Sequence, residues 1–319
     1  MYNSLSYKSK QFFWLIIKLS IVIGCGYFIY TKLIENEQLA FSVFYQNLIQ
    51  NNIFTIKNSL FLLLFTFLNW YLEASKWHLL ISFISNYSFK SALIQSLSSL
   101  TTSLITPNRI GEYGAKAMYF EKKYRKQILG LNLVGNFYQM LITLFFGIIG
   151  FSYFVFKHNI TINLTHFFSI LLIGILIIIS LIFLIKNFNF KGLSFEKVRN
   201  FIKKIPASLN RKVALISLLR FVVFSHQFYF LLLIFNVDIS YVDAISAITS
   251  VYLIASTIPM LSLFDVVLKG SVAIWVFHFF NIEALIILST TTLMWILNFV
   301  LPAIIGSYFV LTFKPNFTK

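Results

Sequence analysis

Cysteine and charge are both scarce in this chain. The single cysteine, Cys25, excludes an intramolecular disulfide and a cysteine-based metal site. Charged residues make up only 11% of the 319 residues, whereas a soluble domain of this length would carry about 25%. Hydrophobic residues account for 58% of the chain. This balance argues against a soluble protein and predicts an integral membrane protein.

The hydrophobic residues fall into long blocks instead of alternating or amphipathic patterns. A block of about 20 apolar residues matches the thickness of a bilayer core. Six blocks of this kind predict full transmembrane helices, at 12–34, 53–72, 128–156, 164–185, 212–235 and 283–313. The longest polar segment, from about Lys186 to Lys212, is too short for a soluble domain. We therefore expect an all-α fold with one membrane domain over residues 1–319 and no attached catalytic domain.

Positive charge between the blocks predicts the topology. The net charge is +16, but the basic residues lie at the ends of apolar blocks, where membrane orientation rather than nucleic-acid binding accounts for them. Segments 107–127 and 186–212 carry six and eight basic residues and belong on the cytoplasmic side. The same rule places both termini in the cytoplasm. We expect a multi-pass protein of the cytoplasmic membrane.

Two further apolar regions, 89–120 and 244–280, are rich in serine and threonine and are broken by proline and then by charges. All basic loops lie on the cytoplasmic side if the first region enters the membrane from the cytoplasm and returns there, and the second enters from outside and returns outside. The chain then consists of two inverted halves, about 10–158 and 159–313, a plan found in transporters. A region that crosses the membrane twice also returns to the side from which it started. The charge pattern therefore leaves open that one broken region forms two complete crossings.

The first broken region contains the strongest candidate site. Thr106 before Pro107 predicts a helix start, with Thr106 as the cap and Pro107 in the first turn. The free N–H groups of that start, together with Arg109, suit a phosphate or carboxylate. Glu112 and Lys116 are four residues apart and are expected to pair on one helix face. The competing interpretation is an ordinary amphipathic helix after a cytoplasmic loop.

The second broken region carries Asp265 and Lys269, again four residues apart. Each charge would cost about 2.5–3.5 kcal/mol at the middle of a bilayer, which favours a pair. A structural salt bridge and a substrate site are compatible here. Arg220 lies about 12 Å into the span that starts near Lys212, too deep to reach the membrane surface easily. It is expected to face a cavity or a partner acid, with a structural pair to Asp265 as the alternative.

A polar stripe on the block 128–156 is formed by Asn132, Asn136 and Gln139, at spacings of four and three residues. We expect these side chains to make hydrogen bonds between helices.

The run from Leu104 to Glu112 resembles the first signature of the lysylphosphatidylglycerol synthase transmembrane-region family, the flippase-like membrane domains. Pro107, Gly111 and Glu112 match that signature. Pro259 and Asp265 match the second signature in place, but its Gly-Gly turn is replaced by residues 261–264. The resemblance covers roughly residues 10–312. It implies two re-entrant segments and a protein that binds or moves a lipid with a polar head.

These observations favour a flippase-like protein that moves a phosphate-containing lipid, either a phospholipid or a polyprenyl-phosphate lipid. The residues expected to bind it are Pro107, Arg109, Gly111, Glu112, Lys116, Arg220, Asp265 and Lys269. No catalytic residue, metal or cofactor is predicted, and the sequence does not favour an enzyme. The alternatives are a membrane-embedded transferase and a regulatory partner of lipid or glycan enzymes. A homo-oligomer is compatible with each of them.

Overall fold

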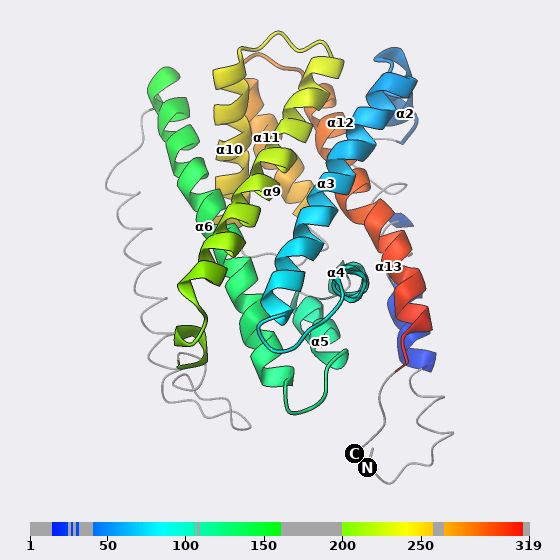
Figure 1. Cartoon of the computed structure of the whole chain (residues 1–319). Coiled ribbons are helices and arrows are strands. Elements are labelled where there is room, and N and C mark those ends of the chain that lie inside the picture. Colours follow the sequence, from blue (N-terminus) through cyan, green and yellow to red (C-terminus); the bar gives the residue numbers. More distant parts are fainter. Residues whose placement is uncertain are drawn as a thin grey trace.

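The computed structural model describes residues 15–24, 27, 30–31, 41–104, 106, 109–160, 200–257 and 265–314, with the side chains of 265 and 266 excepted. Pro107, the predicted span 164–185, most of the basic segment 186–212, segment 258–264 and both termini lie outside these residues. The topology predicted for them stays a prediction. All regular structure in the described residues is helical, which confirms the all-α class (Figure 1).

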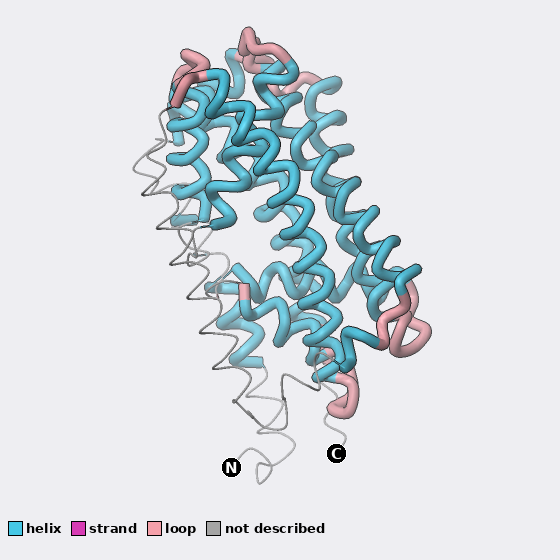
Figure 2. Tube along the Cα trace, turned by 90° about the vertical axis from the view of Figure 1, so that its left-hand side faces the viewer, coloured by secondary structure: helices cyan, strands magenta, loops and turns pink. Residues whose placement is uncertain are grey.

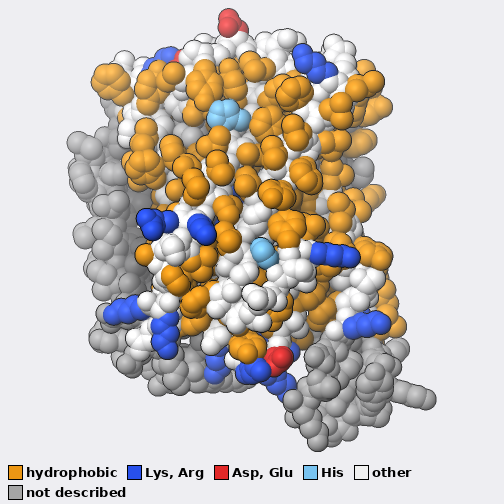
Figure 3. All heavy atoms as spheres, viewed as in Figure 1, with side chains coloured by type: hydrophobic (Ala, Val, Ile, Leu, Met, Phe, Trp, Pro, Cys, Tyr) orange, Lys and Arg blue, Asp and Glu red, His pale blue; other side chains and the backbone are white. Residues whose placement is uncertain are grey.

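Three helices in the described residues are long and apolar enough to cross a membrane. They are α6 (Arg125–Lys157), α9 (Ala207–Ile234) and the continuous helix Ala284–Thr312. Large apolar side chains of α6, such as Phe145, Ile148 and Phe156, are exposed instead of buried. On the face shown in Figure 3, hydrophobic side chains cover most of the surface and Lys and Arg gather mainly in the lower half. Such a surface is unusual for a soluble monomer and fits a lipid environment, so these helices suggest a multi-pass membrane protein.

Besides α6, the first half of the chain contains a short helix and a further long helix. The short helix α2 (Phe41–Gln50) packs on α12 (Ala284–Trp295) at the upper end of Figure 1. Helix α3 (Ile56–Ile81) extends nine residues beyond the predicted block 53–72. At 26 residues it is about 39 Å long, enough to cross a bilayer core. It is not among the three helices that are apolar enough to cross a membrane, because its second half carries polar and charged side chains.

Four shorter helices form two packed pairs. In the lower part of Figure 1, α4 (Phe89–Leu104) packs against α5 (Ile110–Met118). In the upper part, α10 (Tyr241–Thr257) packs against α11 (Asp265–His278). The longest of the four has 17 residues and is about 25 Å long, which is less than the ~30 Å of a bilayer core. Figure 2 shows long helices running side by side along the molecule.

Asparagine ends four of the helices. Asn52, Asn159, Asn236 and Asn281 all adopt positive φ angles, between 48° and 56°. Asparagine tolerates this left-handed conformation better than most residues. After Asn236, the Val237 N–H donates to the Leu232 carbonyl, as in a Schellman motif. The chain can therefore reverse direction in short loops.

A π-helical turn, η3 (Ile296–Val300), joins α12 to α13 (Leu301–Thr312). The Leu301 N–H donates to the Ile296 carbonyl, five residues back instead of four. Pro302 follows, and because it has no N–H it leaves the Asn298 carbonyl without its usual helical donor. The indole Nε1 of Trp70 donates to that carbonyl at 3.1 Å. The proline thus opens the helix backbone to a contact from α3, and turns of this kind often occur at functional sites.

Candidate functional site

One face of α3 carries the centre of the site. Asn69, Glu73 and Lys76 follow one another at helical spacing and are all buried. Glu73 Oε2 lies 2.8 Å from Lys76 Nζ and 2.6 Å from Nη1 of Arg220 on α9. Both contacts are ion pairs. A carboxylate buried in the protein interior requires such compensation.

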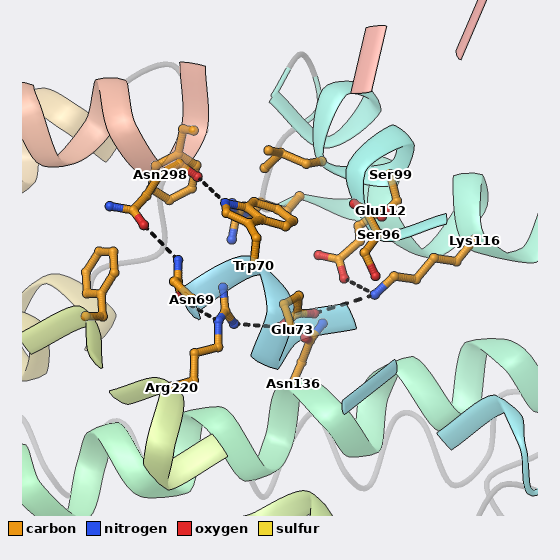
Figure 4. A pocket seen from close by; sticks show the side chains of 14 residues that line it. Asn69, Trp70, Glu73, Ser96, Ser99, Glu112, Lys116, Asn136, Arg220 and Asn298 are labelled. Carbon is orange, nitrogen blue, oxygen red and sulfur yellow. Dashed lines mark hydrogen bonds and ion pairs between the residues drawn. The ribbon is translucent and has the colours of Figure 1, made fainter. Parts of the chain in front are cut away.

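Arg220 therefore has the partner acid that its depth requires, but that acid is Glu73. Its Nε also donates to Asn69 Oδ1 at 2.8 Å. In Figure 4 the guanidinium points toward both α3 side chains. The side chain of Asp265 is outside the described residues, so the alternative pair with Asp265 stays a prediction.

A second ion pair lies beside the first. Lys116 Nζ is 2.8 Å from Glu112 Oε1 and 3.9 Å from Glu73 Oε1. It also donates to Asn132 Oδ1 at 2.8 Å and lies 4.3 Å from the centre of the Trp77 ring. The predicted pair of Glu112 and Lys116 is confirmed. Lys116 is only 1% exposed and links α3, α5 and α6 in the interior.

Asn298 in the π-helical turn connects three helices. Its Oδ1 accepts from Asn69 Nδ2 and its Nδ2 donates to Gln227 Oε1, both at 2.8 Å. Gln227 on α9 in turn donates to Thr66 Oγ1 on α3 at 3.0 Å. These buried side chains satisfy one another, so the polar network is held rigidly between α3, α9 and η3.

The polar stripe of α6 makes the hydrogen bonds between helices that its spacing predicts. Asn136 Nδ2 donates to the Tyr113 hydroxyl of α5 at 3.1 Å. Gln139 Nε2 donates to the Ser217 carbonyl of α9 at 3.4 Å.

Helix α5 begins three residues after the predicted start, and the expectation of Thr106 as its cap residue was wrong. The helix starts at Ile110, and Arg109 is the cap residue, with φ 56° and ψ 27°. The Thr106 hydroxyl still accepts from the Gly111 N–H at 2.9 Å. A non-glycine residue in this left-handed region is strained, and such strain is common at functional sites. The Arg109 guanidinium lies over the Phe299 ring, 4.9 Å from its centre.

Two adjoining cavities lie among these groups. The smaller, about 60 Å³, is lined by Glu73, Glu112, Lys116 and Arg220 and by the neighbours shown in Figure 4. The larger, about 320 Å³, lies between α3, α6, α9, α10, α11 and η3. Its lining residues are Asn69, Arg109, Gln139, Thr143, Arg220, Phe221, Phe224, Tyr252, Ala255, Ser256, Lys269 and Phe299. Asn69, Arg109, Arg220, Phe224 and Phe299 line both cavities.

The larger cavity brings together cations from three separate parts of the chain. Arg109, Arg220 and Lys269 all line it. Lys269 Nζ lies 5.6 Å from the centre of the Phe299 ring, which Arg109 also faces. Three of the predicted residues therefore share one cavity. Basic groups around a partly enclosed space can bind an anion, with guanidinium groups suited to a phosphate.

The remaining predicted residues have other placements. Glu112 and Lys116 line the smaller cavity. Gly111 packs against the α4 backbone, where an added Cβ would lie 2.5 Å from the Thr102 carbonyl oxygen. Its role is helix packing, and the prediction that it binds substrate has no support in this contact. Pro107 and the side chain of Asp265 are outside the described residues.

Sequence reasoning missed Glu73 and Lys76. The predicted block 53–72 ends just before them. The signal that could have found them is the apolar run that resumes at Trp77 and continues to Ile84. Asn298 and Phe299 were missed as well, although Pro302 within an apolar block marks a break in the helix.

No group of three His, Cys, Asp or Glu side chains that could hold a metal occurs among the described residues. A scan of the sequence against protein-family models found no matching family, and a search of curated proteins found no matching relative.

Proposed function

We propose that this protein is a flippase-like membrane protein that binds a lipid by its phosphate and moves the headgroup across the bilayer. The observation that carries the proposal is the convergence of Arg109, Arg220 and Lys269 on one cavity of about 320 Å³. Charges at membrane depth are costly, so their concentration around a cavity favours a binding role. The proposal agrees with the resemblance of the 104–112 run to the flippase-like family.

The proposed topology is an inverted repeat. In the first half, long helix α3 is followed by the short pair α4–α5 and then by long helix α6. In the second half, long α9 is followed by the short pair α10–α11 and then by the long helix Ala284–Thr312. The two halves share one order of elements, and each short pair stays at its own end of the molecule in Figure 1. This order supports two re-entrant segments that dip in from opposite faces.

Cysteine labelling tests the re-entrant segments in a Cys25→Ser background. Asp238 and Glu283 lie in the loops before α10 and after α11, and Asn86 and Lys122 in the loops before α4 and after α5. Cysteines at 238 and 283 are expected to react from one face of the membrane, and cysteines at 86 and 122 from the other. Reaction at 238 and 283 from opposite faces would show that α10 and α11 cross the bilayer together.

In the proposed mechanism, the acyl chains stay in the bilayer while the headgroup enters the basic cavity. Arg109 and Arg220 hold the phosphate there, and Lys269 receives it from the side of α11. Glu73 and Glu112 hold Lys76, Lys116 and Arg220 in position. The cavity would open alternately toward the two faces as the two halves of the repeat move.

Leaflet exchange of a fluorescent anionic phospholipid in reconstituted vesicles tests the function. The Arg109→Gln variant loses a charge-assisted hydrogen bond worth about 1.5–3 kcal/mol, so its exchange rate is expected to fall about tenfold to a hundredfold. Lys123→Gln is the matched control, because Lys123 is exposed and pairs with Glu121 outside both cavities. Wild-type protein that exchanges lipid no faster than protein-free vesicles would contradict the proposal.

A further inference from the structure

The acids of the site are already paired with cations. Glu73 is in ion pairs with Lys76 and Arg220, and Glu112 is in an ion pair with Lys116. Both acids line the smaller cavity, and among the described residues no carboxylate lines the larger one. A positively charged headgroup in the larger cavity would therefore meet cations instead of a free acid.

The charges around the two cavities do not balance. Two carboxylates, Glu73 and Glu112, face three cations, Lys76, Lys116 and Arg220, which leaves one positive charge in excess. Arg109, which is exposed and lines both cavities, forms no ion pair with any described residue and raises the excess to two. Lys269 and Asp265 are left out of this balance, because the Asp265 side chain is not described. Uncompensated charge is costly in a membrane interior, so the site favours a ligand with two negative charges.

The two arginines also have hydrogen-bond donors left for such a ligand. A guanidinium has five N–H groups. Arg220 uses its Nε for Asn69 and its Nη1 for Glu73, and its Nη2 makes no hydrogen bond to a described residue. Arg109 contacts Phe299 through its ring face, which leaves the N–H groups at its edge to bind phosphate oxygens.

We propose that the preferred ligand is a lipid that ends in a phosphate monoester, and that lipids with a cationic headgroup are excluded. This inference rests on the proposed function and narrows its substrate class. A phosphate monoester carries about −1.5 to −2 charges near neutral pH, because its second pKa is about 6. That matches the excess of two positive charges, whereas a phosphodiester supplies one negative charge and an aminoacylated head adds positive charge. Phosphatidic acid and a polyprenyl phosphate share the required chemistry.

Binding of four short-chain lipids to the purified protein in nanodiscs tests this selectivity. They are dioctanoyl phosphatidic acid, farnesyl phosphate, dioctanoyl phosphatidylglycerol and lysyl-phosphatidylglycerol. We expect a monoester to bind about tenfold more tightly than phosphatidylglycerol, and lysyl-phosphatidylglycerol to bind more weakly than either. The better binder of the first two identifies the lipid class. The affinity for the monoester should also fall as the pH is lowered through about 6, while that for phosphatidylglycerol stays constant.

The variants make the test specific to the site. Arg109→Gln removes one of the two excess charges, so it should abolish the preference for the monoester over phosphatidylglycerol. Lys123→Gln, outside the cavities, should keep that preference. Equal or tighter binding of phosphatidylglycerol or lysyl-phosphatidylglycerol would overturn this inference and leave the proposed function intact. Binding of none of the four lipids would overturn both.

Discussion

Replacement of Glu73 by glutamine is expected to destabilise the protein more than any other single change in the site. The change keeps the size of the side chain and removes its charge. Lys76 and Arg220, 2.8 and 2.6 Å from Glu73 Oε2, then lose their common counter-charge in the interior. Removal of one partner from a buried ion pair costs about 3–5 kcal/mol. The measurement is unfolding of the detergent-solubilised protein by heat or by denaturant.

Glu121→Gln is the control for that experiment. Glu121 also pairs with a lysine, Lys123, at 2.9 Å, but both side chains are more than 60% exposed. Exposed pairs contribute about 0–1 kcal/mol, so this variant should unfold nearly like the wild type. If Glu73→Gln and Glu121→Gln unfold alike, the ion pairs around Glu73 do not hold the helices together.

Glu73→Asp separates charge from geometry. It keeps the negative charge but shortens the side chain by one methylene, so the ion pairs lengthen without being abolished. Its stability should lie between those of the wild type and Glu73→Gln. A variant as unstable as Glu73→Gln would show that the position of the carboxylate matters as much as its charge.

The long apolar helices were predictable from sequence because membrane thickness sets their length. Blocks 128–156, 212–235 and 283–313 agree closely with α6, α9 and the helix Ala284–Thr312. The pair of Glu112 and Lys116 was also predictable, since a spacing of four residues places both on one helix face wherever the helix packs. Local spacing and block length are sufficient for such features.

Contacts between distant helices could not be predicted in the same way. Arg220 required a partner acid, but the pattern around it does not distinguish Glu73 from Asp265. Only the packing of α3 on α9 places Glu73 beside the guanidinium. The same holds for Asn298, whose partners Asn69 and Gln227 come from two other helices. The predicted apolar block also ends at residue 72, so Glu73 falls outside it. Hydropathy assigns charged residues to loops, whereas a buried ion pair allows a helix to continue through them.

Gly111 shows how a residue that matches a signature can have a packing role, and its substitution gives the second large effect. In Gly111→Ala, the added Cβ would lie 2.5 Å from the Thr102 carbonyl oxygen and 2.7 Å from Thr106 Oγ1. Backbone atoms cannot move aside cheaply, so α5 must shift away from α4. Overpacking of this kind costs about 1–3 kcal/mol. The shift should also weaken phosphate binding, because Arg109 precedes α5 directly.

Gly114 in the same helix is the matched control. A Cβ at this position meets no atom within 4 Å. Alanine is favoured over glycine inside a helix by up to about 1 kcal/mol, so Gly114→Ala should raise the unfolding temperature while Gly111→Ala lowers it. The same substitution at two positions three residues apart is thus expected to change the unfolding temperature in opposite directions. Stabilisation by Gly111→Ala as well would mean that α4 and α5 do not pack this closely, and the placement of Arg109 at the cavity would lose its support.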